Sequence, residues 1–159
     1  MTVIRVRPQD VAAQWKLALG FLHSAIAWTG GRFTPATVLA DLELGRSQLW
    51  AAVEDAQLYA VAVTQILIYP GGESVGVLYL GGVDSERWGD LLTDALLEYA
   101  RERNCQRLEL FGRKGWERKL PGWNLVGVWL EKEVDDGRLS ETATNGSAGS
   151  TDPVAPVAG

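Results

Sequence analysis

The residues best suited to chemistry in this sequence surround two adjacent glycines, Gly81 and Gly82. They lie in the stretch LYLGGVDSERWGDLLTDALLEYAR, where an apolar run typical of a strand passes into a strongly amphipathic helical pattern. At such a joint, free backbone amides and the positive end of the helix dipole favour an anion, and small residues let the backbone approach it closely. The same joint could serve only to pack a helix on a sheet. The sequence therefore raises the question of whether this joint holds the phosphates of a cofactor.

Few other residues could carry catalysis. The chain has a single histidine, His23, and a single cysteine, Cys105. This leaves almost no material for a Ser-His-Asp triad or a His-based metal site, and it excludes an intramolecular disulfide and a cysteine-rich zinc site. We interpret His23, beside Leu22 on a helical pattern, as a surface or packing residue. The sequence therefore predicts no metal site and no catalytic residue of these kinds.

A second informative segment is LELFGRKGWERKLPGW, residues 108–123, in which basic residues alternate with tryptophans. Trp and Arg are enriched in protein interfaces. We therefore predict that this loop binds a protein partner through five residues: Arg113, Lys114, Trp116, Arg118 and Trp123. Two alternatives remain, a solvated turn whose tryptophans close the end of a sheet, and contact of the cations with phosphate or nucleic acid.

Size and composition limit the class of protein. The chain has 159 residues, of which 47% are hydrophobic and 22% charged, which suits one globular domain. No apolar run is long enough to span a membrane, and the start MTVIRVRPQD lacks the apolar core of a signal peptide, so we expect an intracellular protein that does not enter membranes. The net charge of −5 argues against broad nucleic-acid binding.

The elements that must position these residues follow from the periodicity of apolar residues. Residues 9–28 and 34–45 show helical spacing, and residues 3–6, 48–54, 58–69 and 74–80 are strand-like. A helix after Gly82, ending near Asn104, is followed by a strand at 107–111, a loop with about one helical turn, and a last strand at 125–134. This order predicts an α/β (α+β) domain over residues 1–135. Residues 136–159 are rich in Gly, Ser, Thr, Ala and Pro, which predicts a flexible low-complexity tail.

The order of elements over residues 3–134 resembles the GNAT acetyltransferase fold. The resemblance implies a mixed, mainly antiparallel sheet flanked by helices, with acetyl-CoA bound by the loop after strand 74–80 and by the start of the next helix. The family motif there is Gln/Arg-x-x-Gly-x-Gly/Ala, and the corresponding stretch is GGVDSERWGDLL. It departs from the motif, because Arg87 replaces a glycine and Gly89 falls on the last small position. If acetyl-CoA binds, the resemblance implies contacts from Val83, Arg87 and Gly89.

The same stretch has a purely structural interpretation. Asp84 would cap the helix, Glu86 would complement its dipole, and Trp88 would pack inward with Leu91 and Leu92. A buried Trp88 with a closed groove at residues 82–89 would leave no room for the pantetheine arm of acetyl-CoA.

The residues that GNAT enzymes use for proton transfer are also incomplete. The resemblance implies a glutamate base and a tyrosine donor past strand 107–111. All four tyrosines precede that strand. Glu54, Glu73 and Glu109 could each act as a base, although Glu109 alternates with leucines as the outward face of a strand would.

A narrower pattern, GG-x5-W-x2-LL…LEYAR…C…LELFGRKGW over residues 78–120, is similar to acetyltransferase-like proteins encoded among the head and tail genes of tailed bacteriophages. This resemblance implies a non-catalytic GNAT-like structural or interaction protein without a cofactor, a virion or assembly component. Its partners would be other protein subunits, including phage head or tail proteins, and it would lie in the host cytoplasm and in the virion. We take this as the main prediction. The alternative is an acetyl-CoA-dependent N-acetyltransferase with an atypical pyrophosphate loop.

Overall fold

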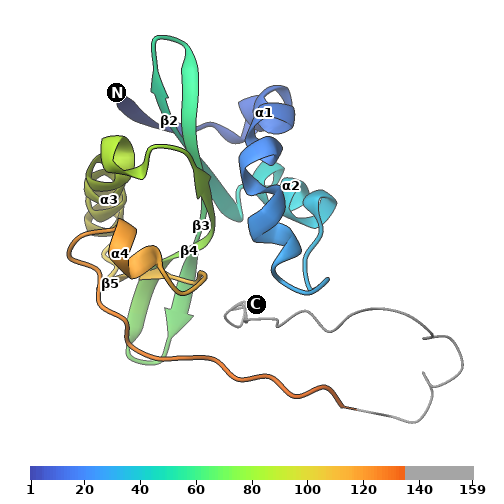
Figure 1. The fold of residues 1–159 in the computed structure, drawn as a ribbon, viewed down its shortest axis with the longest axis vertical. Helices are drawn as coiled ribbons and strands as arrows, with labels where there is room; N and C mark the ends of the chain where they lie inside the picture. The colour runs from blue at the N-terminus through green and yellow to red at the C-terminus, as the bar shows by residue number, and fades with distance from the viewer. Residues whose placement is uncertain (135–159) are drawn as a thin grey trace, which may run out of the picture.

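The computed structural model describes residues 1–134 of the chain, so the predicted tail at 136–159 lies outside the described residues. Nine elements follow one another in the order β-α-α-β-β-β-α-β-α (Figure 1). Their bounds are β1 Thr2–Val6, α1 Pro8–Ala27, α2 Pro35–Glu43, β2 Ser47–Glu54, β3 Gln57–Tyr69, β4 Gly72–Gly82, α3 Ser85–Glu102, β5 Arg107–Leu110 and α4 Trp116–Lys119.

The five strands form one mixed sheet in the order β1-β2-β3-β4-β5. The first four strands pair antiparallel, and β5 pairs parallel with β4. Helices α1 and α2 cover one face of the sheet, and α3 and α4 cover the other (Figure 1). The predicted fold class, an α/β domain with a mainly antiparallel sheet flanked by helices, is confirmed.

Local sequence signals explain most of the boundaries. Thr34 caps α2 in a capping box with Thr37, and a proline occupies the first helical position. Helix α3 ends where Asn104 adopts a left-handed conformation at φ 57°, and the amide of Cys105 donates to the carbonyl of Ala100. This is a Schellman ending, in which two orphan carbonyls of the last turn gain partners.

The last strand predicted from the sequence, at 125–134, is wrong. Residues 124–134 lie outside any helix or strand of the structure. The indole of Trp123 donates to the hydroxyl of Thr93 on α3 at 3.2 Å, and from there the chain leaves the sheet (Figure 1). The apolar alternation is real, but a strand must also pair with a sheet edge, and within residues 1–134 no strand pairs with this stretch.

Among residues 1–134, no helix is both long and apolar enough to cross a bilayer.

Candidate functional site

The candidate site lies where β4 and β5 part. The two strands pair only from Ser74 and Arg107 to Val77 and Leu110, and the amide of Phe111 donates the last bond to the carbonyl of Val77 at 3.0 Å. Strand β4 then continues to Gly82. Because a parallel neighbour is missing there, an opening forms beside the end of β4.

A bulge in β4 contributes to this opening. The register with β3 shifts between Val63 and Thr64, so that Leu78 has no residue opposite it. A bulge bends its strand and increases the local twist, and bulges often occur next to functional sites. Here the bend falls just beyond the last residue of β4 that pairs with β5.

The opening is a cavity of about 390 Å³. It has three walls: the second half of α1, the end of β4, and the loop after β5 together with α4. The side chains that matter most for its chemistry are Phe21 of α1, Trp28 at its C-cap, Phe111 and Arg113 of the loop, and Trp116 and Lys119 of α4. The wall of the cavity therefore combines aromatic side chains with polar groups, among them two cations.

The two glycines of the strand-to-helix joint permit close packing on opposite faces of the sheet. A Cβ at Gly81 would lie 1.9 Å from the carbonyl oxygen of Phe21, so the backbones of β4 and α1 are in direct contact. A Cβ at Gly82 would lie 2.7 Å from the ring of Trp88. Packing of helices on the sheet thus requires glycine at both positions.

Backbone groups of β4 also face the cavity. The amide of Val83 donates to the carbonyl of Tyr59 at 2.9 Å, so Val83 and Tyr59 form a hydrogen-bonded pair of the antiparallel ladder. Backbone groups alternate in direction along such a ladder, which turns those of Leu80 and Gly82 away from β3 and toward the opening. The end of β4 therefore presents unpaired peptide groups to whatever enters the cavity.

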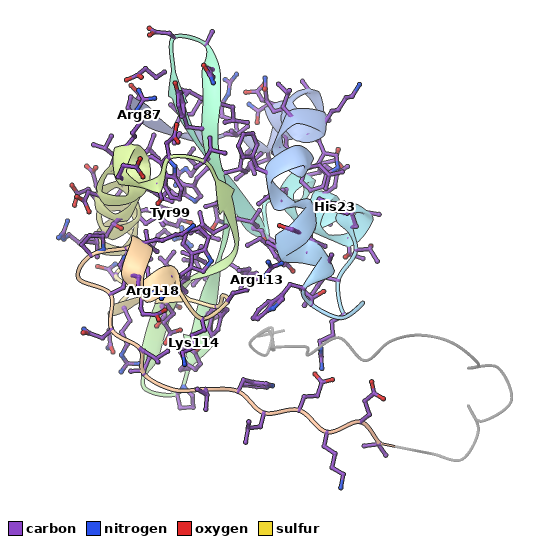
Figure 2. All side chains as sticks on the ribbon, viewed as in Figure 1. His23, Arg87, Tyr99, Arg113, Lys114 and Arg118 are labelled. Atoms are coloured by element: carbon purple, nitrogen blue, oxygen red, sulfur yellow. The ribbon has the colours of Figure 1, made fainter. Side chains whose placement is uncertain are left out.

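The three residues predicted to contact a cofactor are separated. Val83 lines the cavity, but its amide is bonded to Tyr59. The guanidinium of Arg87 pairs with Glu54 and lies over the ring of Tyr59, 4.5 Å from its centroid. Figure 2 shows Arg87 near the start of α3, well away from Arg113, which lies between α4 and α1. Gly89 packs against α4, where a Cβ would lie 3.4 Å from Leu120. A role for these three residues in cofactor binding stays a prediction.

The ion pair of Arg87 belongs to a network at the amino terminus. The amino group of Met1 bonds to Glu54 at 2.7 Å, and the other carboxylate oxygen of Glu54 takes Arg87. The hydrogen bond from Met1 and the charge of Arg87 hold the pKa of Glu54 below its ordinary value. This carboxylate is therefore committed to structure, and it does not line the cavity.

The start of α3 agrees in part with the structural interpretation. Trp88 is completely buried, and its indole donates to the carbonyl of Val83 at 2.6 Å. Asp84 is the N-cap residue, but it adopts a left-handed conformation and its side chain caps no amide. Leu91 is exposed, so the prediction that it packs inward is wrong, because the buried stripe runs through positions 88, 92, 96 and 99. A buried Trp88 does not close the cavity, because its indole packs on the face of the sheet that α3 covers.

The five residues predicted to bind a partner also separate into three groups. Trp116 and Trp123 are half-buried and pack against the core, with Trp116 6.4 Å from Trp88 between ring centroids. Arg113 donates to the carbonyl of Ser24 at 3.0 Å and so joins the loop after β5 to α1. Lys114 and Arg118 are exposed (Figure 2). Partner binding by these residues stays a prediction.

Sequence reasoning missed Lys119, Trp28 and Phe21 as cavity residues. Lys119 lies 5.5 Å from the ring centroid of Trp116, and Phe21 touches β4 through its backbone. The signal that could have indicated Lys119 was its place among the alternating cations and tryptophans of residues 113–123. No comparable signal marks one face of α1 as a cavity wall.

Among the described residues, no carboxylate, imidazole, thiol or phenol lines the cavity. His23 is exposed on α1, outside the lining (Figure 2). Glu109 accepts a hydrogen bond from the hydroxyl of Tyr69 at 2.9 Å. Within residues 1–134, no three acidic, histidine or cysteine side chains are grouped as a metal site would require.

Comparison with known proteins identifies the fold. No protein-family model matches the chain, and no curated protein matches it in sequence. Solved structures do match. A protein of Clostridium acetobutylicum, called a predicted acetyltransferase and solved with acetyl-CoA, is 17% identical with a TM-score of 0.57, over 83% of this chain and 95% of that one. A ribosomal-protein-alanine N-acetyltransferase of Brucella melitensis is 16% identical with a TM-score of 0.52, and the match covers 82% of this chain and 100% of that one. A GNAT family acetyltransferase of Staphylococcus aureus is 13% identical with a TM-score of 0.57, and the match covers 84% of this chain and 100% of that one.

These similarities show a GNAT-like fold. They give no support to the predicted link with tailed bacteriophages.

Proposed function

We propose that this protein binds acetyl-CoA in the cavity beside the end of β4 and transfers the acetyl group to an amine. The observation that carries the proposal is the cavity of about 390 Å³ at the parting of β4 and β5. It occurs in a chain that shares its fold with a structure solved with acetyl-CoA.

The residues present fit this cofactor. The pantetheine arm is a narrow chain with two amide groups, and the peptide groups of Leu80 and Gly82 that face the opening can pair with amides as a neighbouring strand would. Phe21, Trp28 and Phe111 supply apolar contact for its methylene groups. When bound, acetyl-CoA supplies an acetyl thioester that an amine can attack.

We assign the phosphate charge of the cofactor to Arg113 and Lys119. Both cations line the cavity, whereas Arg87 is paired with Glu54 and is not in the lining. Asp84 adds a negative charge beside the start of α3, which opposes a diphosphate at that helix end. The phosphates would therefore lie toward α4 and the loop after β5.

Proton transfer would depend on water. Because the described walls of the cavity contain no carboxylate, imidazole, thiol or phenol, the acceptor amine would enter as the free base or lose its proton to solvent. The role of the chain is then to bind and orient its two substrates, which by itself can lower a barrier considerably.

The first test is thermal unfolding with and without acetyl-CoA and CoA. At a hundred times the dissociation constant, a ligand stabilises by about 2.7 kcal/mol, which for a domain of this size raises Tm by roughly 5 to 10 °C. The double variant Arg113→Ala with Lys119→Ala should lose most of this rise, and the matched variant Arg87→Ala should keep it. Release of free thiol from acetyl-CoA in the presence of candidate amines then tests transfer.

Three results would count against the proposal in different ways. An unchanged Tm at saturating acetyl-CoA would refute cofactor binding. Loss of the rise in Arg87→Ala alone would move the phosphates to the start of α3, as the family resemblance implies. A rise in Tm without thiol release from any amine would leave a binding protein without transferase activity.

A further inference from the structure

The stretch 125–134, here termed the C-terminal apolar segment, is an extended chain with one apolar face in solvent. Val126 is fully exposed, and Val128 and Leu130 are 83% and 89% exposed. These residues alternate along the sequence with Trp129, which is only 50% exposed, and with Glu131, which pairs with Arg32 of the loop between α1 and α2. The segment thus has the two-residue period of a strand, with its apolar side turned away from the molecule.

The same chain has an open sheet edge. Strand β5 is the last strand of the sheet, and within residues 1–134 no strand pairs with its outer side (Figure 1). Leu108 and Leu110 of β5 are half-buried, and Arg107 is exposed. An edge of this kind presents a row of unpaired amides and carbonyls that can accept another strand.

We propose that the C-terminal apolar segment of one chain pairs antiparallel with β5 of a second copy. A register that sets Leu130 opposite Leu108 also sets Val128 opposite Leu110. In that register Glu131 lies opposite Arg107, which matches opposite charges on the other face of the sheet. One alignment therefore satisfies both the apolar and the charged positions.

A second copy fits better than the edge of the same chain. In the structure, Trp123 is fixed on α3 and Glu131 is fixed on Arg32, so both ends of the segment are held away from the β5 strand of their own chain. Within residues 1–134, each chain has one unpaired segment and one unpaired sheet edge, so two chains related by a twofold axis can satisfy both at once. The proposal is independent of the proposed acetyltransferase activity.

The first test is sedimentation velocity of the full chain over a wide range of concentrations. We expect a dimer for the wild type. The double variant Val128→Lys with Leu130→Lys should weaken it by at least about tenfold in dissociation constant. The matched control is Leu17→Lys with Leu44→Lys, which makes the same kind of change at two exposed leucines of α1 and of the end of α2. This control should remain a dimer.

The second test distinguishes pairing between two chains from pairing within one chain. In a Cys105→Ser background, chains carrying Leu108→Cys are mixed with chains carrying Leu130→Cys under mild oxidation, and a disulfide between two different chains is expected. Both substitutions in one chain should likewise give linked dimers. A wild type that is monomeric at every concentration, a dimer unaffected by the lysines at 128 and 130, or an internal disulfide in a monomer would each overturn the proposal.

Discussion

The contact between α1 and β4 leads to a sharp prediction for Gly81→Ala. A Cβ at this position would lie 1.9 Å from the carbonyl oxygen of Phe21. An ordinary carbon to oxygen contact is about 3.3 Å, so the two backbones would have to separate by roughly 1.4 Å. Because the obstacle is backbone in the middle of a twenty-residue helix, no side-chain rotation can relieve it.

The expected cost lies at the upper end of the range for overpacked cores, about 3 kcal/mol. For a domain of this size this corresponds to a fall in Tm of roughly 6 to 12 °C. The measurement is thermal unfolding of the purified variant, repeated with urea so that the change in free energy of unfolding is obtained directly. A change in the midpoint with an unchanged slope would show a loss of stability without loss of two-state behaviour.

Gly20→Ala is the matched control. Gly20 also lines the cavity, but a Cβ there meets nothing within 4 Å, and the residue lies inside α1. Alanine should therefore stabilise the helix by up to about 1 kcal/mol. Equal stability of Gly81→Ala and the wild type would refute the inference that the two backbones are in contact, whereas equal losses in both variants would point to the cavity wall as the sensitive feature.

Two further predictions concern the start of α3 and the amino terminus. Trp88→Phe should lower the free energy of unfolding by about 1 to 3 kcal/mol, because the smaller ring leaves a cavity in the core and loses the hydrogen bond to the carbonyl of Val83. Urea unfolding measures this change, and a wild-type value would refute the packing role of the indole. Glu54 has a lowered pKa, so its contribution to stability is present above its ordinary value of 4.5 and is lost as the pH falls through the lowered pKa. Glu54→Gln should therefore reduce Tm at neutral pH, and the difference from the wild type should shrink toward strong acid; a difference independent of pH would contradict this sign.

Much of the fold could be predicted from local signals. The spacing of apolar residues over 9–28, the Thr34-Pro35 cap and the Pro70 to Gly72 turn each determine an element with little influence from the rest of the chain. Helix α3 was predictable for the same reason, since its buried stripe has a helical period and Asn104 ends it.

The last strand could not be predicted correctly, because strand formation depends on a partner edge. The alternation in residues 125–134 would be compatible with a strand in any context, but pairing depends on where Trp123 fixes the chain. Local patterns carry no information on this contact between residues 93 and 123. The same stretch regains its predicted conformation in the proposed dimer, in which a second copy supplies the edge.

The site was predictable only in part, because its geometry arises from the absence of a neighbouring strand beside the end of β4 within the described residues. From the sequence, Gly81 and Gly82 were candidates for a phosphate-binding loop. In the structure, Gly81 lets β4 pack on α1, and Gly82 makes room for the ring of Trp88. The cavity instead follows from where the short strand β5 aligns with β4 and from the bulge at Leu78. The sequence predicted the short strand, but neither the alignment nor the bulge has a sequence signature. Val83 was found because it adjoins the glycines, whereas Lys119 comes from a different element brought near by tertiary packing.

Under the proposed function, the joint at residues 81–89 would combine packing and cofactor binding, with packing assigned to side chains and binding to the backbone. Side chains at the joint pack: Trp88 fills the space beside Gly82, and Arg87 closes the network at Glu54. Backbone groups at the end of β4 remain free to bind, because β5 ends too early to pair with them. Substitutions of Trp88 or Arg87 should accordingly change stability more than cofactor affinity, while Arg113 and Lys119, which contribute little to the core, should do the reverse.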